Sequence, residues 1–457
     1  MFHIHKIGAF NPFTLDMVTR LFDGANTQTV DGILKENYEA FIAEQVNQKN
    51  PWKDVYKTQD VPYGGRETVY TAHVSRNVSP MFTGEDGAFA EAGAQGHVEV
   101  RVGQKKLMGR VRITPEAMYD TSKGEYAWKQ ARKDEMDGLI KDLARREEYA
   151  LTLDGRGVLA LVDDATPSGA TTVGVDAPGG IANDNFGNRF IMVGMFVAFV
   201  NPATGALRAG IRKVMSVSSD GGSVVLDSAP DATVADNDQI VQAANSAVTD
   251  ILDTSYENAF WGIVALVDDG TYRSNYFGID RDIYDAYNSY VNPATGAFSL
   301  DVMQQASDVV DQKLNGKTNL LAMQHAIRRV YITTLEADRR YSGASLQRPD
   351  GGTAAFQQGD LTMGEVPIKA IRDLPLDMVF GLDTENSGSV CYTSEKGKWV
   401  DEDGRILVRV GSGSGARDAF EAWYRIRKQY HMRYPGVNWR LDGITGQTII
   451  VVRPAGD

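Results

Sequence analysis

Two glycine-containing segments come nearest to a chemical motif, and both resemble parts of nucleotide-binding loops. Gly316-Lys317-Thr318 matches the end of a phosphate-binding loop, but Asp311 stands where the pattern needs its first glycine. Because the segment follows a helical pattern and not a strand, we predict that Gly316 is a helix C-cap. Residues 411–416 follow a predicted strand but open no βαβ unit, so we interpret them as a flexible loop. Neither segment predicts a cofactor site.

The titratable residues show no spacing typical of a metal or catalytic centre. The histidines are His3, His5, His73, His97, His325 and His431. No pair of them has the spacing of a metallopeptidase helix, and the acidic doublets lack the central glycine of a calcium loop. Cys391 is the only cysteine, which excludes an intrachain disulfide and a multi-cysteine metal site. We therefore predict no enzyme activity, no catalytic residue, no metal and no cofactor.

Length and charge limit the class of protein further. At roughly 150 residues per domain, 457 residues predict about three domains or one elaborated fold. The formal charge is 47 − 60 = −13, which excludes a generally basic nucleic-acid coat. No window approaches the ~20 apolar residues of a membrane helix, and the N-terminus lacks the pattern of a secretory signal. We expect a protein made inside the cell, without a membrane partner.

The first quarter of the chain predicts elements that extend away from a core. Residues 1–58 contain a helical stripe from Thr29, which either caps its own domain or forms an arm on a neighbouring subunit. Residues 66–113 alternate like two strands of a hairpin with a glycine-rich tip at 82–93. Such a hairpin is marginally stable alone and needs a surface to lie on. This is the first indication of assembly.

The rest of the chain predicts a long helix followed by mixed structure. A charged helix from about Ser122 to Leu153, roughly 45 Å long, suits a structural strut. Residues 166–250 contain short strands separated by turn signals and predict a small antiparallel barrel or sandwich. The remaining expected elements are helices at 299–314 and 416–430, and strands at 366–371, 378–382, 406–410 and 448–452.

A basic run in this acidic chain is the clearest candidate for an interface. It is either a solvated hairpin face, a face for an acidic surface such as the tip of another copy, or a contact to nucleic acid. The candidate interface residues are Trp52, Phe82, Glu85, Asp86, Phe89, Glu91, Arg101, Lys105, Lys106, Arg110 and Arg112. Within this set the acidic residues belong to the tip, and the basic residues follow it.

Several segments resemble the major capsid proteins of tailed bacteriophages of the Hong Kong 97 type. Residues 107–118 are similar to the strand that leaves the extended loop, and residues 135–159 to the spine helix with its glycine-rich turn. Residues 262–270 and 278–284 are similar to the segment that opens the axial domain, and Leu374-Pro375 to its late strand. The resemblance covers most of residues 30 to 445. It implies an α+β fold of the Hong Kong 97 type.

The resemblance also implies a division of the chain into parts. The expected parts are an N-terminal arm at 1–58, an extended hairpin loop at 59–113, a peripheral domain with the spine helix at 114–165, a β-rich insertion domain at 166–250, an axial domain at 251–385 and a C-terminal region at 386–457 that returns to both domains. The insertion departs from the minimal fold, although some short-tailed phage coats carry one. No N-terminal scaffolding segment is recognisable, and no motif marks a cross-linking lysine–asparagine pair.

The function implied by this resemblance is mechanical. Copies would assemble as pentamers and hexamers into an icosahedral shell around viral double-stranded DNA, without sequence-specific contact to it. A separate scaffolding protein, a portal and decoration proteins are the further partners implied. The implied location is the virion, with assembly in the host cytoplasm.

Three alternatives stay open at this point. Encapsulins are bacterial shells of the same fold, from which the length and the insertion set this chain apart. A soluble hydrolase or nucleotide-dependent enzyme would be built around Gly316 or Gly411. A β-rich decoration or fibre protein would explain the strands after residue 166 but not the long helix.

Overall fold

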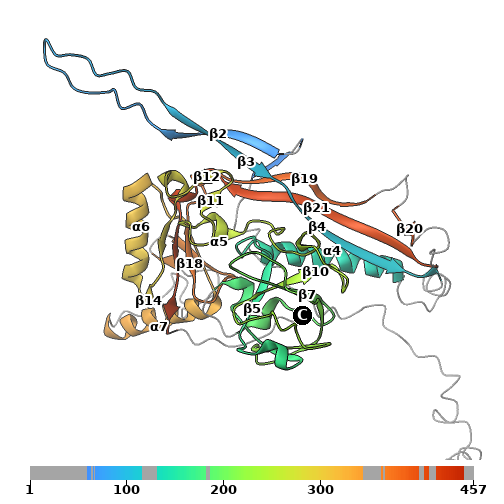
Figure 1. The fold of residues 1–457 in the computed structure, drawn as a ribbon. Coiled ribbons are helices and arrows are strands. Elements are labelled where there is room, and N and C mark those ends of the chain that lie inside the picture. Colours follow the sequence, from blue (N-terminus) through green and yellow to red (C-terminus); the bar gives the residue numbers. More distant parts are fainter. Residues whose placement is uncertain are drawn as a thin grey trace, which may run out of the picture. The chain divides into compact units, whose positions relative to one another are not determined.

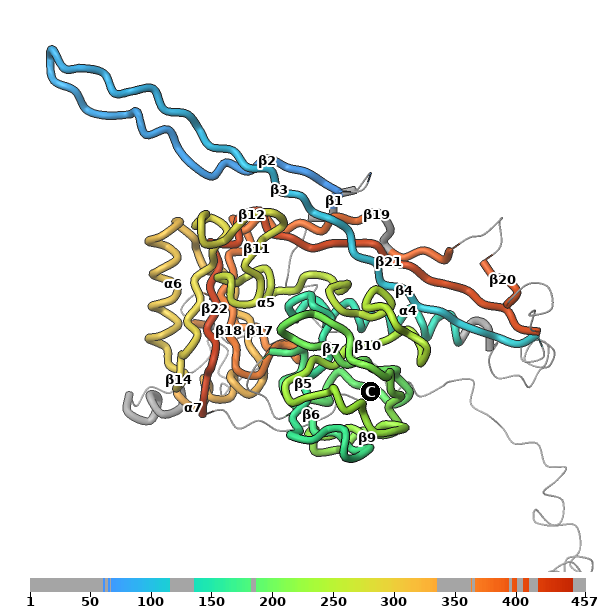
Figure 2. Tube along the Cα trace, in the orientation of Figure 1, coloured from blue at the N-terminus to red at the C-terminus, as the bar shows by residue number. Residues whose placement is uncertain are grey.

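The computed structural model describes residues 59–62, 65, 67–115, 131–181, 186–342, 362–363, 366–400, 406–410 and 418–446. The chain divides into two compact units, the second of which comprises the described residues within 45–115 and 135–457. Nearly all described residues belong to the second unit, whose fold is drawn in Figures 1 and 2. The expected N-terminal arm with Trp52, the start of the strut helix, the loop at 411–416 and the final strand lie outside the described residues.

A sheet built around one long strand runs through this unit. The central strand β21 (Phe420–Met432) is antiparallel to β4 (Lys105–Ile113) and to β19 (Ser389–Trp399). On the far side of β19, β1 (Gln59–Pro62) pairs with it in parallel, and β20 (Val408–Arg409) pairs with the start of β21. The sheet therefore joins segments from both ends of the described chain.

The helix expected at 416–430 is wrong, because β21 occupies this segment as a strand. Ala422, Ile426 and Tyr430 lie on the same face of the strand and are buried, but their spacing of four residues also fits a helix. The aromatic and branched residues of this segment favour a strand in any case, and β4 and β19 supply ladder hydrogen bonds on both edges. Pairing with distant strands thus decides the structure here.

The strut helix packs against one face of this sheet. Its described part, α4 (Ala131–Ala150), confirms the helix expected there and lies along β4 and β21 in Figure 1. Gly109 of β4 lies so close to Leu139 and Leu143 of the helix that a Cβ atom would collide with both. The buried carboxylate of Glu147 accepts hydrogen bonds from Lys428 Nζ at 2.9 Å and Tyr430 Oη at 2.7 Å. These bonds fix the helix to β21.

A closed antiparallel barrel follows the strut helix. Its strands pair in the order β10-β5-β6-β9-β8-β7. They are β5 (Val158–Val162), β6 (Thr172–Asp176), β7 (Phe196–Val200), β8 (Arg212–Val217), β9 (Ser223–Leu226) and β10 (Gln239–Ala243). The barrel thus includes β5, which precedes residue 166. The connection before β7 contains a short 3-10 helix at Gly187–Phe190.

A second sheet with two helices holds the other main core. Its strand order is β13-β22-β18-β15-β17-β16. These are β13 (Tyr290–Asn292), β15 (Leu320–Met323), β16 (Thr362–Met363), β17 (Val366–Ala370), β18 (Val379–Leu382) and β22 (Trp439–Leu441). Trp439 lies directly over Gly381, where any side chain would collide with the indole. The core of this region is completed by α6 (Leu300–Leu314).

The ends of α6 show which caps the sequence uses. Ser299 Oγ accepts the main-chain N–H of Val302, so the expected start of the helix is confirmed. The expected C-cap at Gly316 is wrong, because Asn315 takes the left-handed position with φ 53°. Gly316 serves a different purpose, since a Cβ atom there would collide with the main chain of Val437. Asparagine is the residue that most readily replaces glycine at such a cap.

The remaining described elements are short, apart from one helix. They are α5 (Ile263–Leu266), α7 (His325–Ser342), β11 (Asn275–Tyr276), β12 (Ile279–Asp280), β14 (Gly296–Ala297) and β23 (Ile444–Thr445). Among the helices described, none is both long and apolar enough to cross a lipid bilayer.

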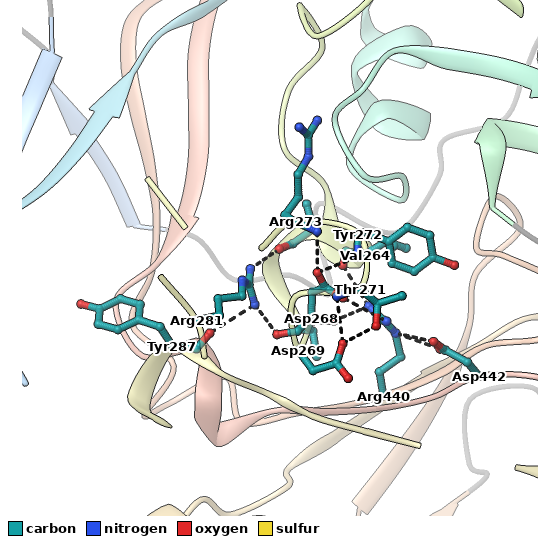
Figure 3. Close-up of polar contacts among 12 residues, drawn as sticks. Val264, Asp268, Asp269, Thr271, Tyr272, Arg273, Arg281, Tyr287, Arg440 and Asp442 are labelled. Carbon is teal, nitrogen blue, oxygen red and sulfur yellow. Dashed lines mark hydrogen bonds and ion pairs between the residues drawn. The ribbon is translucent and has the colours of Figure 1, made fainter. Parts of the chain in front are cut away.

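A buried network of charged groups joins β22 to the segment after α5 (Figure 3). Arg440 has no exposed side-chain surface, and it contacts Asp268 at 3.2 Å and Asp442 at 2.8 Å. Its Nη1 also donates to the carbonyl oxygens of Val264 and Val267, and Arg281 donates to the carbonyl oxygen of Asp268. Nearly every polar group is therefore satisfied, as buried charges require.

We predict that Arg440→Met lowers the free energy of unfolding by about 3–5 kcal/mol, because it leaves the Asp268 carboxylate buried without its cation. Urea denaturation of the full chain, followed by tryptophan fluorescence, measures the change. Arg409→Met is the matched control, since Arg409 is 62% exposed and pairs with Asp418, which is 73% exposed. A loss no larger than that of the control would show that the network contributes little.

Candidate subunit interface

The expected hairpin is present and extends beyond the sheet that anchors it. Strands β2 (Glu67–Ser75) and β3 (Gly96–Gly103) pair in antiparallel register, with Tyr70 opposite Val100. The inward face carries Ala72, Val100 and Val102, all buried, and the other face is exposed. This confirms the alternation expected from the sequence. Residues 76–95 continue past the strands as an open loop (Figures 1 and 2).

The base of the hairpin is held by a stack of aromatic rings. The Tyr70 ring stacks on His431 of β21 at 5.2 Å between centroids, and Tyr392 of β19 packs on the same imidazole at 4.8 Å. Arg101 also donates its main-chain N–H to the carbonyl oxygen of Phe277. Because these partners come from the central sheet and the segment after α5, the base is fixed to the body of the unit.

Burial keeps His431 neutral. The side chain has no exposed surface, and this desolvation lowers the pKa of the imidazole to about 4, with the charge of Arg433 acting in the same direction. At neutral pH the ring is therefore an uncharged stacking partner for Tyr70. Protonation would place a positive charge between two aromatic residues in an apolar environment.

The tip of the hairpin presents large apolar side chains that the described part of the chain does not cover. Phe82 and Phe89 are fully or almost fully exposed, and Val78 is 90% exposed. The two sides of the loop are joined where Asn77 Nδ2 donates to the Gly93 carbonyl at 2.8 Å. Single exposed apolar residues are common on proteins, but several of them on one thin protrusion are typical of an interaction site.

Acidic residues lie between these apolar ones. Glu85, Asp86 and Glu91 are all exposed in the same loop. From here on, the name tip refers to residues 78–91, with their exposed apolar and acidic side chains, in place of the range 82–93 expected from the sequence.

The basic run expected as one face is divided by the pleat of β4. Lys106, Arg110 and Arg112 are exposed on the face away from α4, whereas Lys105 points to the opposite face. There its Nζ donates to the carbonyl oxygen of Glu257 at 2.5 Å, and burial lowers the pKa of its ammonium group. Lys105 is therefore bound within its own chain. Arg101 lies on β3 and pairs with Glu99.

Two arginines of β21 complete the basic surface, and the sequence analysis missed them. In the register of β4 and β21, Arg427 lies opposite Lys106 and Arg425 opposite Met108, so both share the outward face. We call Lys106, Arg110, Arg112, Arg425 and Arg427 the basic face. In the sequence, Arg425 and Arg427 stand on either side of the buried Ile426. This alternation would have identified them, but the segment was predicted as a helix.

The basic face has two acidic neighbours in the register of its own sheet, since Glu421 lies opposite Arg112 and Glu395 of β19 lies opposite Arg427. Arg110 contacts the buried carboxylate of Glu421 at 3.7 Å. Like charges on facing strands repel one another, as Lys106 and Arg427 do. An acidic surface laid on this face would relieve that repulsion, so the face favours an acidic partner.

The main-chain N–H of Lys317 and the thiol of Cys391, which an enzyme could use, both lie in structural positions. The main-chain N–H of Lys317 donates to the Asp383 carboxylate at 2.9 Å, so a carboxylate lies where a phosphate loop would bind its anion. Cys391 is buried in β19. Throughout the described ranges, no group of three or more histidine, cysteine, aspartate or glutamate side chains is placed to hold a metal.

A cavity of about 530 Å³ lies below the sheet, lined by residues of β4, α4 and the barrel, among them Leu107, Tyr149 and Leu159. Its lining is mixed apolar and basic, and it shows none of the acid–base groupings of a catalytic site.

We predict that the stability of the protein depends on the neutral state of His431. The folded pKa lies below the ordinary value of about 6.5, so the contribution is complete above pH 6.5 and is lost as the pH falls towards 4, by about 3 kcal/mol in all. His431→Phe keeps the stack without a titrating group and should remove this part of the pH dependence. Chemical denaturation at pH 7 and pH 4.5 measures it. Tyr392→Phe, the control, should keep the wild-type dependence.

Comparison with known proteins places these features in a known fold. A chain of the cyanophage A-1(L) capsid asymmetric unit is similar over 92% of this chain and 100% of its own, with 10% identity and a TM-score of 0.55. A chain of the capsid of a native GTA particle covers 92% and 100% at 8% identity and a TM-score of 0.48. A chain of Mycobacterium phage Adephagia covers 94% and 96% at 10% identity and a TM-score of 0.42.

No family model matches the chain, and no curated protein does. The likeness to the cyanophage chain, which includes nearly the whole of both, shows the fold. The chain therefore has the α+β fold of tailed-phage capsid proteins of the Hong Kong 97 type, as the sequence predicts.

Proposed function

We propose that this chain is the major capsid protein of a tailed bacteriophage. Copies assemble as pentamers and hexamers into an icosahedral shell that encloses double-stranded DNA. The observation that carries the proposal is a capsid fold shared over nearly the full length with the cyanophage chain, together with a hairpin whose apolar tip is exposed. The finer division is proposed with it: arm 1–58, extended loop 59–113, peripheral domain 114–165, β-rich insertion 166–250, axial domain 251–385 and C-terminal region 386–457.

We infer that the tip of one copy lies on the basic face of the next. The tip carries Glu85, Asp86 and Glu91, and the exposed surface of β4 carries Lys106, Arg110 and Arg112 beside the apolar Met108. The two surfaces differ, so the contact is heterologous and repeats around a ring instead of closing a pair. Apolar burial at Phe82 and Phe89 supplies affinity, and the charges supply register.

The other partners belong to the same proposal. A scaffolding protein directs assembly in the host cytoplasm, a portal occupies one vertex, and decoration proteins bind the finished virion. The net charge of −13 supports containment of DNA without sequence-specific contact, because a basic lining would bind the phosphates tightly. Nuclease-protected DNA in particles from infected cells would separate this proposal from an encapsulin-like shell.

We predict that Phe82→Ser with Phe89→Ser abolishes shells without unfolding the chain. Each phenylalanine buries in the contact, where its loss costs about 1.5–3 kcal/mol, and every subunit makes that contact. Light scattering and negative-stain microscopy, with the scaffolding protein present, measure shell yield. Met215→Ser on the barrel is the matched control, since Met215 is also exposed (54%). Shells at the wild-type yield from the double variant would refute a role for the tip.

We predict that charge reversal on either surface impairs assembly and that the two reversals together restore it. The first variant is Glu85→Lys with Asp86→Lys, and the second is Lys106→Glu with Arg427→Glu. Attraction between the surfaces is then replaced by repulsion in each variant alone and re-established in the combination. Shell yield and its salt dependence are measured, because exposed charge pairs weaken with ionic strength.

Asp308→Lys on the exposed side of α6 is the control for a general effect of charge. If the combined variant assembles no better than either single reversal, the two surfaces do not meet.

A further inference from the structure

Two histidines face each other on the exposed side of the hairpin. His73 of β2 and His97 of β3 are direct partners in the antiparallel register, and both side chains are exposed. Their ring centroids lie 5.3 Å apart with an angle of 58° between the planes. Neither residue takes part in the aromatic stack at the base or in the tip, so neither the fold nor the proposed contact uses them.

This arrangement fits a pair of metal ligands. Imidazole nitrogen suits the late first-row divalent ions, zinc and copper among them. Two nitrogens bound to one tetrahedral zinc at 2.0–2.1 Å are about 3.4 Å apart. Ring nitrogens lie on the rim of each imidazole, so two of them turned towards each other come closer than the centroids. The cross-strand spacing is therefore within reach of a shared ion by side-chain rotation alone.

Gln95 supplies the supporting contact that such a site needs. Its Oε1 lies 2.5 Å from Nε2 of His73. With that nitrogen as the donor, the neutral ring keeps its lone pair on Nδ1, the nitrogen left for a metal. Histidine ligands almost always donate their second N–H to an oxygen in this way, which fixes the tautomer and the orientation of the ring. Gln95 thus holds His73 in the tautomer whose Nδ1 can bind a metal ion.

We propose that His73 and His97 form a two-histidine site for a divalent transition-metal ion such as Zn²⁺, which bridges β2 and β3. Within the described residues no third histidine, cysteine or carboxylate is placed to join them, so water completes the coordination. A two-stranded ribbon is only marginally stable beyond its anchored base. An ion that binds only the paired strands stabilises that pairing by mass action. The inference does not depend on the proposed shell.

The test is zinc binding by the full chain, measured by isothermal titration. We expect one ion per chain, lost in His73→Asn and in His97→Asn, and weakened roughly 10-fold or more in Gln95→Leu. Hydrogen exchange at the amides of β2 and β3 gives a second measure, because zinc should slow it in the wild type and leave both histidine variants unchanged. Circular dichroism of the metal-free variants shows whether they remain folded.

A variant with His3→Ala and His5→Ala is the matched control and should bind as the wild type does. Zinc binding that survives in either His73→Asn or His97→Asn, or no binding by the wild type in the micromolar range, would overturn the proposal. So would binding that disappears only in the His3 and His5 variant. Each of these results is independent of whether shells form.

Discussion

The hydrogen-bond ladders on the two edges of β21 hold the described structure together. One edge binds β4, which directly follows the hairpin, and the other binds β19 from the C-terminal part of the chain. The inner face of the same strand binds α4 through Glu147, and its outer face carries His431 under the hairpin base. One strand therefore positions the helix, the hairpin and the basic face together, so these parts keep a fixed geometry relative to one another.

Fixing the base while exposing the tip solves a specific physical problem. A two-stranded ribbon cannot bury enough apolar surface to hold itself in place, and the stack of Tyr70 on His431 supplies the missing anchor. Beyond that anchor the loop carries Phe82 and Phe89 into solvent, which costs free energy until another surface covers them. Any surface that covers these two side chains would therefore lower the free energy of the protein.

The sequence predicted best where local signals and tertiary structure agree. Alternation identified β2 and β3, and Ser299 marked the start of α6, because strand pleat and helix capping are local effects. It failed at β21, where apolar residues also fit helical spacing and only pairing with β4 and β19 decides between the two. That error hid Arg425 and Arg427, since a helix would have placed them on different faces. Lys105 was misplaced for the related reason that neighbours on a strand point in opposite directions.

The way the barrel closes has a consequence for how this protein can change. Its first strand β5 pairs with its last strand β10, with Val158 opposite Val241, so the chain enters and leaves the barrel at adjoining positions. A closed barrel has no free edge through which it could recruit foreign strands. An exposed loop such as residues 202–204 can therefore lengthen without altering the spacing of the elements before and after the barrel. The connection between β6 and β7 is fixed, by contrast, because Arg189 pairs with Asp373 and Phe190 stacks on Tyr149 of α4. The barrel can thus carry added sequence in its exposed loops, while Arg189 and Phe190 hold it against the rest of the unit.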